Sequence, residues 1–146
     1  MVYRLIVLLA SAGYVAACGN SPSPIAPTPT AEGTYTLRTA NGAPLPFYPM
    51  PASLPSLAIL GDTLTIFPFG VAQTRGSYVF GGVIENAIGQ ANYTMSGAQL
   101  TLTFSNGGGT VLGGNMAIGS VAVASWNGSA TLTVPYGGVV YVYRRP

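Results

Sequence analysis

Short runs of alternating apolar and polar residues, most of them ended by glycine or asparagine, fill this chain from Gly33 to its C-terminus. Every second side chain of such a run points to the same face of a sheet, so the alternation predicts β-strands with one buried face. Sustained helical periodicity is absent from this part of the sequence. We therefore expect an all-β domain with strands near 33–39, 63–67, 75–80, 91–95, 100–104, 117–124, 130–134 and 139–144.

The links between these runs are rich in glycine and asparagine, and most have the length of hairpin turns. Eight to ten strands joined in this way form an antiparallel up-and-down meander. Such a meander either closes into a small barrel of about eight strands or packs as a β-sandwich. The roughly 114 residues of 33–146 suffice for one modest core, so we expect a single domain there.

Four segments of this region carry more specific signals. Asn41-Gly42, after the first run, is the strongest hairpin signal. Five prolines between Ala43 and Leu57 predict an edge strand or a long loop, because proline cannot donate to a sheet ladder. Gly81 to Gln90 has a weak strand pattern, with a single helical turn as the alternative. Gly61-Asp62 is expected to form a turn, since aspartate bonds to nearby backbone in turns.

The first seventeen residues have the composition of an export signal. Arg4 is followed by thirteen uncharged residues, Leu5 to Ala17, which end in the small residues Ala16 and Ala17. A charged start, an apolar stretch and a small-residue cleavage site define a signal peptide. The apolar stretch is shorter than the roughly 20 residues of a transmembrane helix. We therefore expect 1–17 to be a signal peptide that is removed.

The segment Val15-Ala16-Ala17-Cys18 resembles the lipobox of bacterial lipoproteins. The resemblance implies that Cys18 becomes the mature N-terminus and carries a diacylglyceryl group, so that membrane lipid is its partner. Two or three acyl chains are needed for stable attachment. Gly19 replaces the aspartate that retains some lipoproteins at the inner membrane, which implies the outer membrane of a Gram-negative envelope. The alternative is an ordinary secretory signal followed by a chance cysteine.

Residues 18–32 are expected to tether the domain to that anchor. The stretch from Gly19 to Thr30 contains four prolines among Ser, Ala and Thr, a composition that favours extended polyproline-like chain. At about 3.1 Å per residue it would span roughly 40 Å. We therefore divide the sequence into a signal peptide (1–17), a lipidated cysteine with a proline-rich linker (18–32) and an all-β domain (33–146).

Three groups of residues within 33–146 resemble a second known family, the lipocalin-like β-barrel domains of uncharacterised type in bacterial lipoproteins. They are Gly33-Thr-Tyr-Thr-Leu with Asn41-Gly42 and Leu45-Pro46, Tyr93-x-x-x-Gly97-x-x-Leu100-x-Leu102, and Tyr141-Val-Tyr-Arg-Arg145.

This likeness implies a meander barrel whose last strand closes against its first. In lipocalins an arginine of the last strand covers an aromatic ring of the first strand, and here Tyr35 with Arg144 or Arg145 would take those parts. The sequence departs from lipocalins by having tyrosine in place of tryptophan and by inserting the proline-rich stretch. The alternative reading of the terminal arginines is a solubilising end on an apolar strand.

The composition of the mature chain argues against an enzyme. It has no Lys, no His and no Cys apart from Cys18, and its only carboxylates within the domain are Asp62 and Glu85. Acid–base and nucleophilic catalysis need groups that titrate or can be activated. Zinc and iron sites need nitrogen and sulfur ligands, so no metal or other cofactor is expected. The near-neutral charge balance also offers no basic field for nucleic acid.

Two binding roles remain. The first is a non-catalytic binding module for a small apolar ligand inside the barrel, with the proline-rich segment as a lid that carries Phe47, Tyr48 and Met50. The alternative is that these three residues do not form a lid but pack on the core or cover a sheet edge. The second role is a structural or protein-interaction lipoprotein with a filled core, which contacts an envelope partner through its surface.

Overall fold

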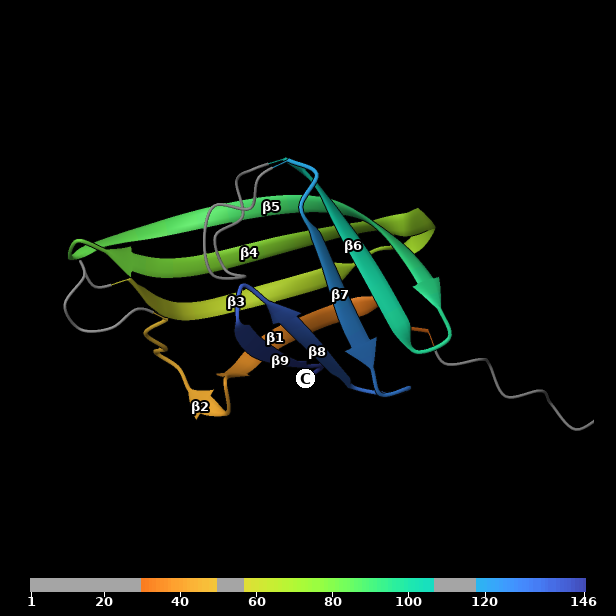
Figure 1. Cartoon of the computed structure of the whole chain (residues 1–146), viewed down its shortest axis with the longest axis horizontal. Helices are drawn as coiled ribbons and strands as arrows, with labels where there is room; N and C mark the ends of the chain where they lie inside the picture. Colours follow the sequence, from red (N-terminus) through yellow and green to blue (C-terminus); the bar gives the residue numbers. More distant parts are fainter. Residues whose placement is uncertain (1–29, 50–56, 107–117) are drawn as a thin grey trace, which may run out of the picture.

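The computed structural model describes residues 30–49, 57–106 and 118–146, and Figure 1 shows how its strands are arranged. The described part contains one 3₁₀ turn, η1 (Pro68–Gly70), and no α-helix. None of its helical segments is long and apolar enough to cross a membrane. The strands are β1 (Gly33–Ala40), β2 (Ala43–Pro44), β3 (Ala58–Ile66), β4 (Val71–Phe80), β5 (Val83–Ser96), β6 (Gln99–Asn106), β7 (Val121–Trp126), β8 (Thr131–Tyr136) and β9 (Val139–Arg144).

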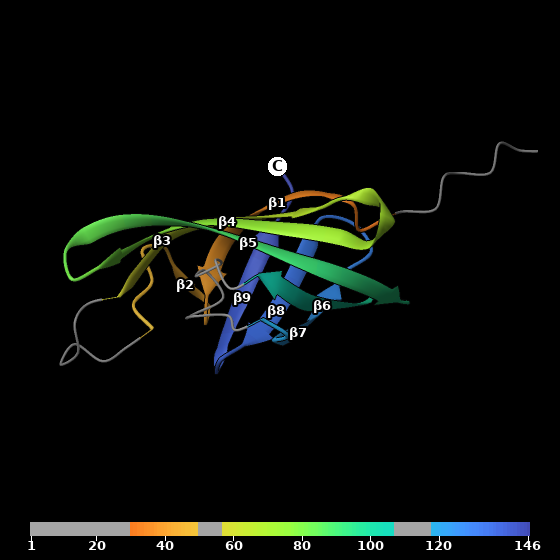
Figure 2. The ribbon, with the colours of Figure 1, turned by 90° about the horizontal axis from the view of Figure 1, so that it is seen from above.

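Strands β1 and β3 to β9 form a closed antiparallel barrel, and β2 is an extra strand at its rim. Each of these strands pairs with the next one along the chain, and β9 returns to pair with β1. The first half of β1 pairs with β3, from Gly33 to Thr36, while its second half pairs with β9. The expected all-β meander is confirmed, and the barrel is the correct alternative to the sandwich. In Figure 2, β3 to β5 lie across β8 and β9 at a steep angle.

The hairpin predicted at Asn41-Gly42 is present and also helps to close the barrel. Both residues have positive φ angles, 50° and 77°, which Asn and Gly tolerate better than other residues. The turn joins β1 to β2. The Asn41 side-chain oxygen accepts a hydrogen bond of 2.7 Å from the Val140 amide, and the Asn41 amide donates to the Val140 carbonyl at 2.8 Å. One turn therefore holds three strands together.

Strand pairing overrides the local signals at two positions. The segment 81–90 forms the Gly81-Gly82 turn and the start of β5, because β4 and β5 pair without interruption from Val71↔Asn92 to Phe80↔Val83. The expected turn at Gly61-Asp62 is wrong. β3 pairs with β4 on both sides of these residues, with a register shift at Leu60, and this β-bulge absorbs the irregularity inside the strand.

The proline-rich segment lies at the rim in its described part. Ala43 and Pro44 pair with the end of β1, and Phe47 exchanges backbone hydrogen bonds of 3.0 and 2.8 Å with Ile59. The edge strand expected here is confirmed for these residues, with few ladder bonds because the prolines cannot donate. The remainder of the segment, 50–56, lies outside the described residues.

Large and small side chains share the barrel interior in a regular way. Inward-facing Tyr, Leu, Ile and Phe residues come from β1, β3, β6 and β9, whereas β4, β5 and β7 contribute mainly Ala and Gly. Across β6 and β7, Leu100 pairs with Ala124 and Leu102 with Ala122, and all four are at most 1% exposed. Small barrels fill their interior by such alternation. The result is a packed core.

The packed interior makes a prediction at Ala124. Because its neighbours leave no accessible surface there, Ala124→Leu should overpack the core and lower the free energy of unfolding by about 1–3 kcal/mol, measured by urea denaturation. Val123→Leu, on the outward face of the same strand, should change it by less than about 0.5 kcal/mol.

The swap Leu100→Ala/Ala124→Leu conserves the summed volume and should recover part of the loss. Unchanged or increased stability of Ala124→Leu alone would mean that empty space adjoins Ala124.

Candidate functional site

A buried carboxyl group lies inside the barrel. Asp62 of β3 is 4% exposed, and the hydroxyl of Tyr143 from β9 donates to its Oδ2 at 2.5 Å. Tyr141, two residues before Tyr143, points to the same interior. Asp62 Oδ1 and the Tyr141 hydroxyl have no hydrogen bond of good geometry among the described residues. An unpaired buried polar atom costs roughly 1–3 kcal/mol, so this cluster is expensive to keep.

Burial dominates the electrostatics of this cluster. It raises the pKa of Asp62 to about 7, while the Tyr143 hydroxyl and the backbone amides of Thr63 and Arg75 partly offset the shift. Burial and the neighbouring carboxylate raise the pKa of Tyr141 to about 12 and that of Tyr143 well above the usual value. Asp62 therefore exchanges a proton near neutral pH, and the two phenols stay protonated there.

The cluster does not by itself assemble a recognisable reaction centre. A carboxyl group and two phenols supply one proton acceptor near neutral pH, without a positioned nucleophile. Within the described ranges, no group of three or more His, Cys, Asp or Glu side chains is placed to hold a metal ion. The chemistry that this geometry supports is proton uptake and hydrogen bonding inside the barrel.

Protonation of Asp62 makes stability depend on pH. The pKa is higher in the folded chain than its ordinary value of 3.8, so the folded state binds more protons between these two values. The free energy of unfolding should therefore be highest below about pH 4 and fall as the pH rises to about 7. Wild type should lose on the order of 4 kcal/mol between pH 4 and pH 8, and Asp62→Asn should remove this slope.

Urea denaturation at pH 4.5, 6 and 8 measures this difference. Glu85→Gln makes the same acid-to-amide change on the exposed β4–β5 hairpin and should keep the wild-type slope. A slope that survives in Asp62→Asn would show that another group carries it.

Tyr35 and Arg145 meet where the barrel closes. The Arg145 guanidinium lies 4.9 Å from the centroid of the buried Tyr35 ring, a cation–π contact worth about 0.5–2 kcal/mol. Nη2 of Arg145 donates to the carbonyls of Thr30, at 2.8 Å, and Glu32. The Tyr35 hydroxyl donates to the Ala31 carbonyl at 2.8 Å. These contacts bind the chain that precedes β1 to the end of β9.

Of the two terminal arginines named from the sequence, Arg145 covers Tyr35 and Arg144 does not. Arg144 pairs with Thr36 on the outward face of β9 and is exposed. Burial raises the pKa of Tyr35, and the Arg145 charge lowers it in part. The arrangement of an arginine of the last strand over an aromatic ring of the first is the one that the lipocalin likeness implies.

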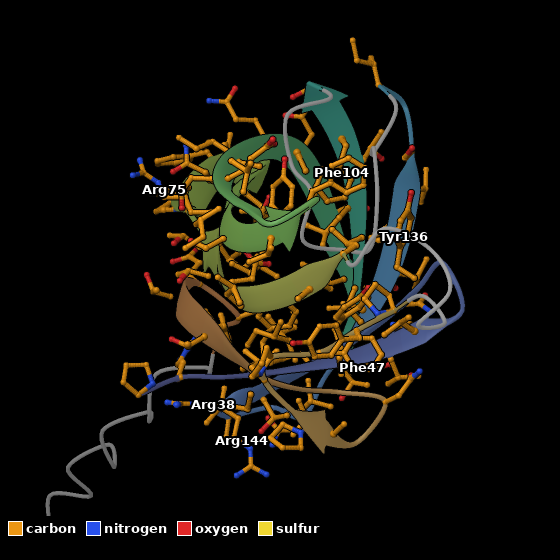
Figure 3. The ribbon with its side chains drawn as sticks, turned by 90° about the vertical axis from the view of Figure 1, so that its left-hand side faces the viewer. Arg38, Phe47, Arg75, Phe104, Tyr136 and Arg144 are labelled. Atoms are coloured by element: carbon orange, nitrogen blue, oxygen red, sulfur yellow. The ribbon has the colours of Figure 1, made fainter. Side chains whose placement is uncertain are left out.

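A groove of about 440 Å³ runs along the outside of the β1–β9 seam. We call it the arginine groove, and its lining residues are Arg38, Thr39, Val142, Arg144 and Arg145. Figure 3 shows Arg38 and Arg144 close together on one side of the barrel, with Arg75 far from them. Sequence reasoning missed Arg38. The groove residues Val142, Arg144 and Arg145 are 104 or more positions away from it and meet it only when the barrel closes.

The lid residues named from the sequence divide between core and surface. Phe47 is partly buried and packs against the core cluster, whereas Tyr48 is 59% exposed. Met50 and Cys18 both lie outside the described residues. Phe47 therefore acts as packing at the rim in this structure, and the lid remains a prediction.

Several large apolar side chains are exposed outside the barrel. Phe69 in η1 is completely exposed and has a φ of 68°, an unfavourable backbone for a bulky residue. A second group lies on the β4–β5 hairpin, which extends past the other strands in Figure 1. We call this group the hairpin surface; Phe80 and Val83, which pair across the hairpin, lie on one face of it, and Ile84 and Ile88 lie on the other.

No family model matches the chain, and no curated protein or solved structure is significantly similar to it.

Proposed function

We propose that this protein is a non-catalytic interaction module of the bacterial envelope, a filled lipocalin-like barrel held at the outer membrane by a lipidated Cys18. The packed interior is the observation that carries the proposal. Tyr35, Leu100, Leu132 and Tyr141 are 0% exposed, so no water-sized space adjoins them. A ligand cavity of the usual kind requires several hundred Å³ lined by such side chains. Contacts with a partner are therefore made by the outer surface.

The exposed apolar side chains support this role. A bulky residue in the left-handed region costs roughly 1–2 kcal/mol, and Phe69 recovers nothing by burial. The side chains of the hairpin surface are between 49% and 65% exposed. Exposed apolar patches of this kind mark interaction sites in soluble proteins, so an envelope partner with an apolar face fits both positions.

The anchor is supported by the lipobox likeness of residues 15–18 and by the place where the chain joins the barrel. Arg145 binds the carbonyls of Thr30 and Glu32, so the linker reaches the barrel at the β1–β9 seam. Thr30 lies twelve positions after Cys18 in the sequence. An extended linker of this length would hold the barrel within roughly 40 Å of the membrane.

The anchor is tested by Cys18→Ser in the full chain. Lipidation needs the thiol, so this variant should lose labelling by a fatty-acid probe and move from the membrane fraction to the soluble fraction. Ser105→Cys in the Cys18→Ser background restores a thiol elsewhere and should not restore labelling. Unchanged labelling of Cys18→Ser would refute the anchor.

The filled interior is tested by native mass spectrometry of the full protein after mild detergent extraction. We expect the mass of the lipidated chain alone, because the interior leaves no room for a second molecule. A stoichiometric apolar molecule that co-purifies would contradict the filled core and support the ligand carrier instead. In that case Ala124→Leu should displace the molecule.

A further inference from the structure

The arginine groove gathers positive charge that the rest of the chain lacks. The described residues include four arginines and no lysine or histidine, and three of those arginines line this one groove. No aspartate or glutamate is among its lining residues. Glu32 is the carboxylate nearest to Arg38 in sequence. Burial raises the pKa of Tyr93, and the charge of Glu32 raises it further. The groove is therefore a concentrated positive site on a nearly uncharged barrel.

A β-bulge turns Arg38 into the groove. Leu37 pairs with Tyr143 and Thr39 with Val142, so Arg38 is the extra residue of β1 opposite β9. Both Arg38 and Thr39 lie on the outward side, between the buried Leu37 and Ala40. Bulges re-aim side chains in this manner and are common beside functional sites. Arg38, Thr39 and Arg144 thereby project from one short stretch of the seam.

The hydrogen-bonding capacity of these arginines is largely unused. Within the described ranges, neither the side chain of Arg38 nor that of Arg144 makes a hydrogen bond or an ion pair with another residue. Nε of Arg145 is buried and also has no partner there, although Nη2 of the same guanidinium binds two carbonyls. Guanidinium groups with free donors match the oxygens of phosphate and carboxylate groups.

We propose that the arginine groove binds a phosphoryl group. The guanidinium groups of Arg38 on β1 and Arg144 on β9 would donate hydrogen bonds to its oxygens. The Thr39 hydroxyl would add a donor, and Val142 would form the apolar floor of the groove. A tetrahedral phosphoryl group uses such divergent donors better than a single planar carboxylate does. The group belongs either to a free phosphate ester or to the headgroup of an anionic lipid, and the same contacts serve both.

The test uses the full chain with Cys18→Ser, so that no lipid anchor contributes to binding. Inorganic pyrophosphate is titrated by calorimetry at low ionic strength, and co-sedimentation is measured with vesicles of phosphatidylglycerol or of phosphatidylcholine. Arg38→Gln and Arg144→Gln should each weaken binding by roughly tenfold, the value of one charge-assisted contact. Arg145 is left intact because it stacks on Tyr35.

Arg75→Gln is the matched control. Arg75 is exposed on β4, bonds to Gln73 at 2.8 Å and lies far from Arg38 and Arg144 in Figure 3. The variant removes the same charge and should change the affinity by less than about twofold, as expected for a distant surface charge. Thermal unfolding of all three variants shows whether each remains folded, and a groove variant that unfolds is replaced by Thr39→Val, which removes only a donor.

Each outcome decides the proposal. Groove-dependent binding of pyrophosphate and of phosphatidylglycerol vesicles supports a phosphoryl site open to both sources. If only pyrophosphate binds, and Arg38→Gln and Arg144→Gln weaken this binding, the ligand is a free phosphate ester. If only phosphatidylglycerol vesicles bind in this way, the ligand is a lipid headgroup. Absence of binding to both probes, or equal weakening by Arg75→Gln, overturns the proposal, because the arginines would then act only through net charge.

Discussion

The pairing of β9 with β1 is the constraint on which the rest of this structure depends. An open meander would leave the edges of both strands unpaired and prone to join other chains. Pairing from Thr36↔Arg144 to Ala40↔Tyr141 removes both edges and brings together residues more than 100 positions apart. Tyr35 then meets Arg145, and both terminal arginines reach Arg38. The interior cluster and the exterior groove are consequences of the same closure.

Inside the closed barrel, packing and charge oppose each other. The interior is filled by large side chains set against Ala and Gly, which excludes water from Asp62. Desolvation favours the neutral carboxyl, and the Tyr143 hydroxyl only partly compensates for it. Apolar packing alone would be more stable than a buried carboxyl with one unpaired oxygen. Asp62 therefore introduces a titrating group near neutral pH into a core that is otherwise inert.

Outside the barrel, charge is concentrated whereas apolar surface is spread. Three arginines line the groove along the β1–β9 seam, where Arg145 binds the chain before β1. Exposed apolar side chains lie on η1, on the β4–β5 hairpin, on β7 and on β9. With the proposed anchor at Cys18, the arginine groove would stay near the tether and the hairpin surface would be left for a partner.

The sequence by itself determined the strand content, the meander order and the Asn41-Gly42 hairpin, because alternation and turn chemistry are local properties. The resemblance to lipocalins implied a contact of Tyr35 with Arg144 or Arg145, with a solubilising strand end as the alternative, and the structure forms it with Arg145. Only the tertiary structure placed Asp62 inside a strand, extended β5 through 83–90 and brought Arg38 and Arg144 to one groove. Register and closure decide these features, and both depend on pairing between distant segments, which local patterns do not encode.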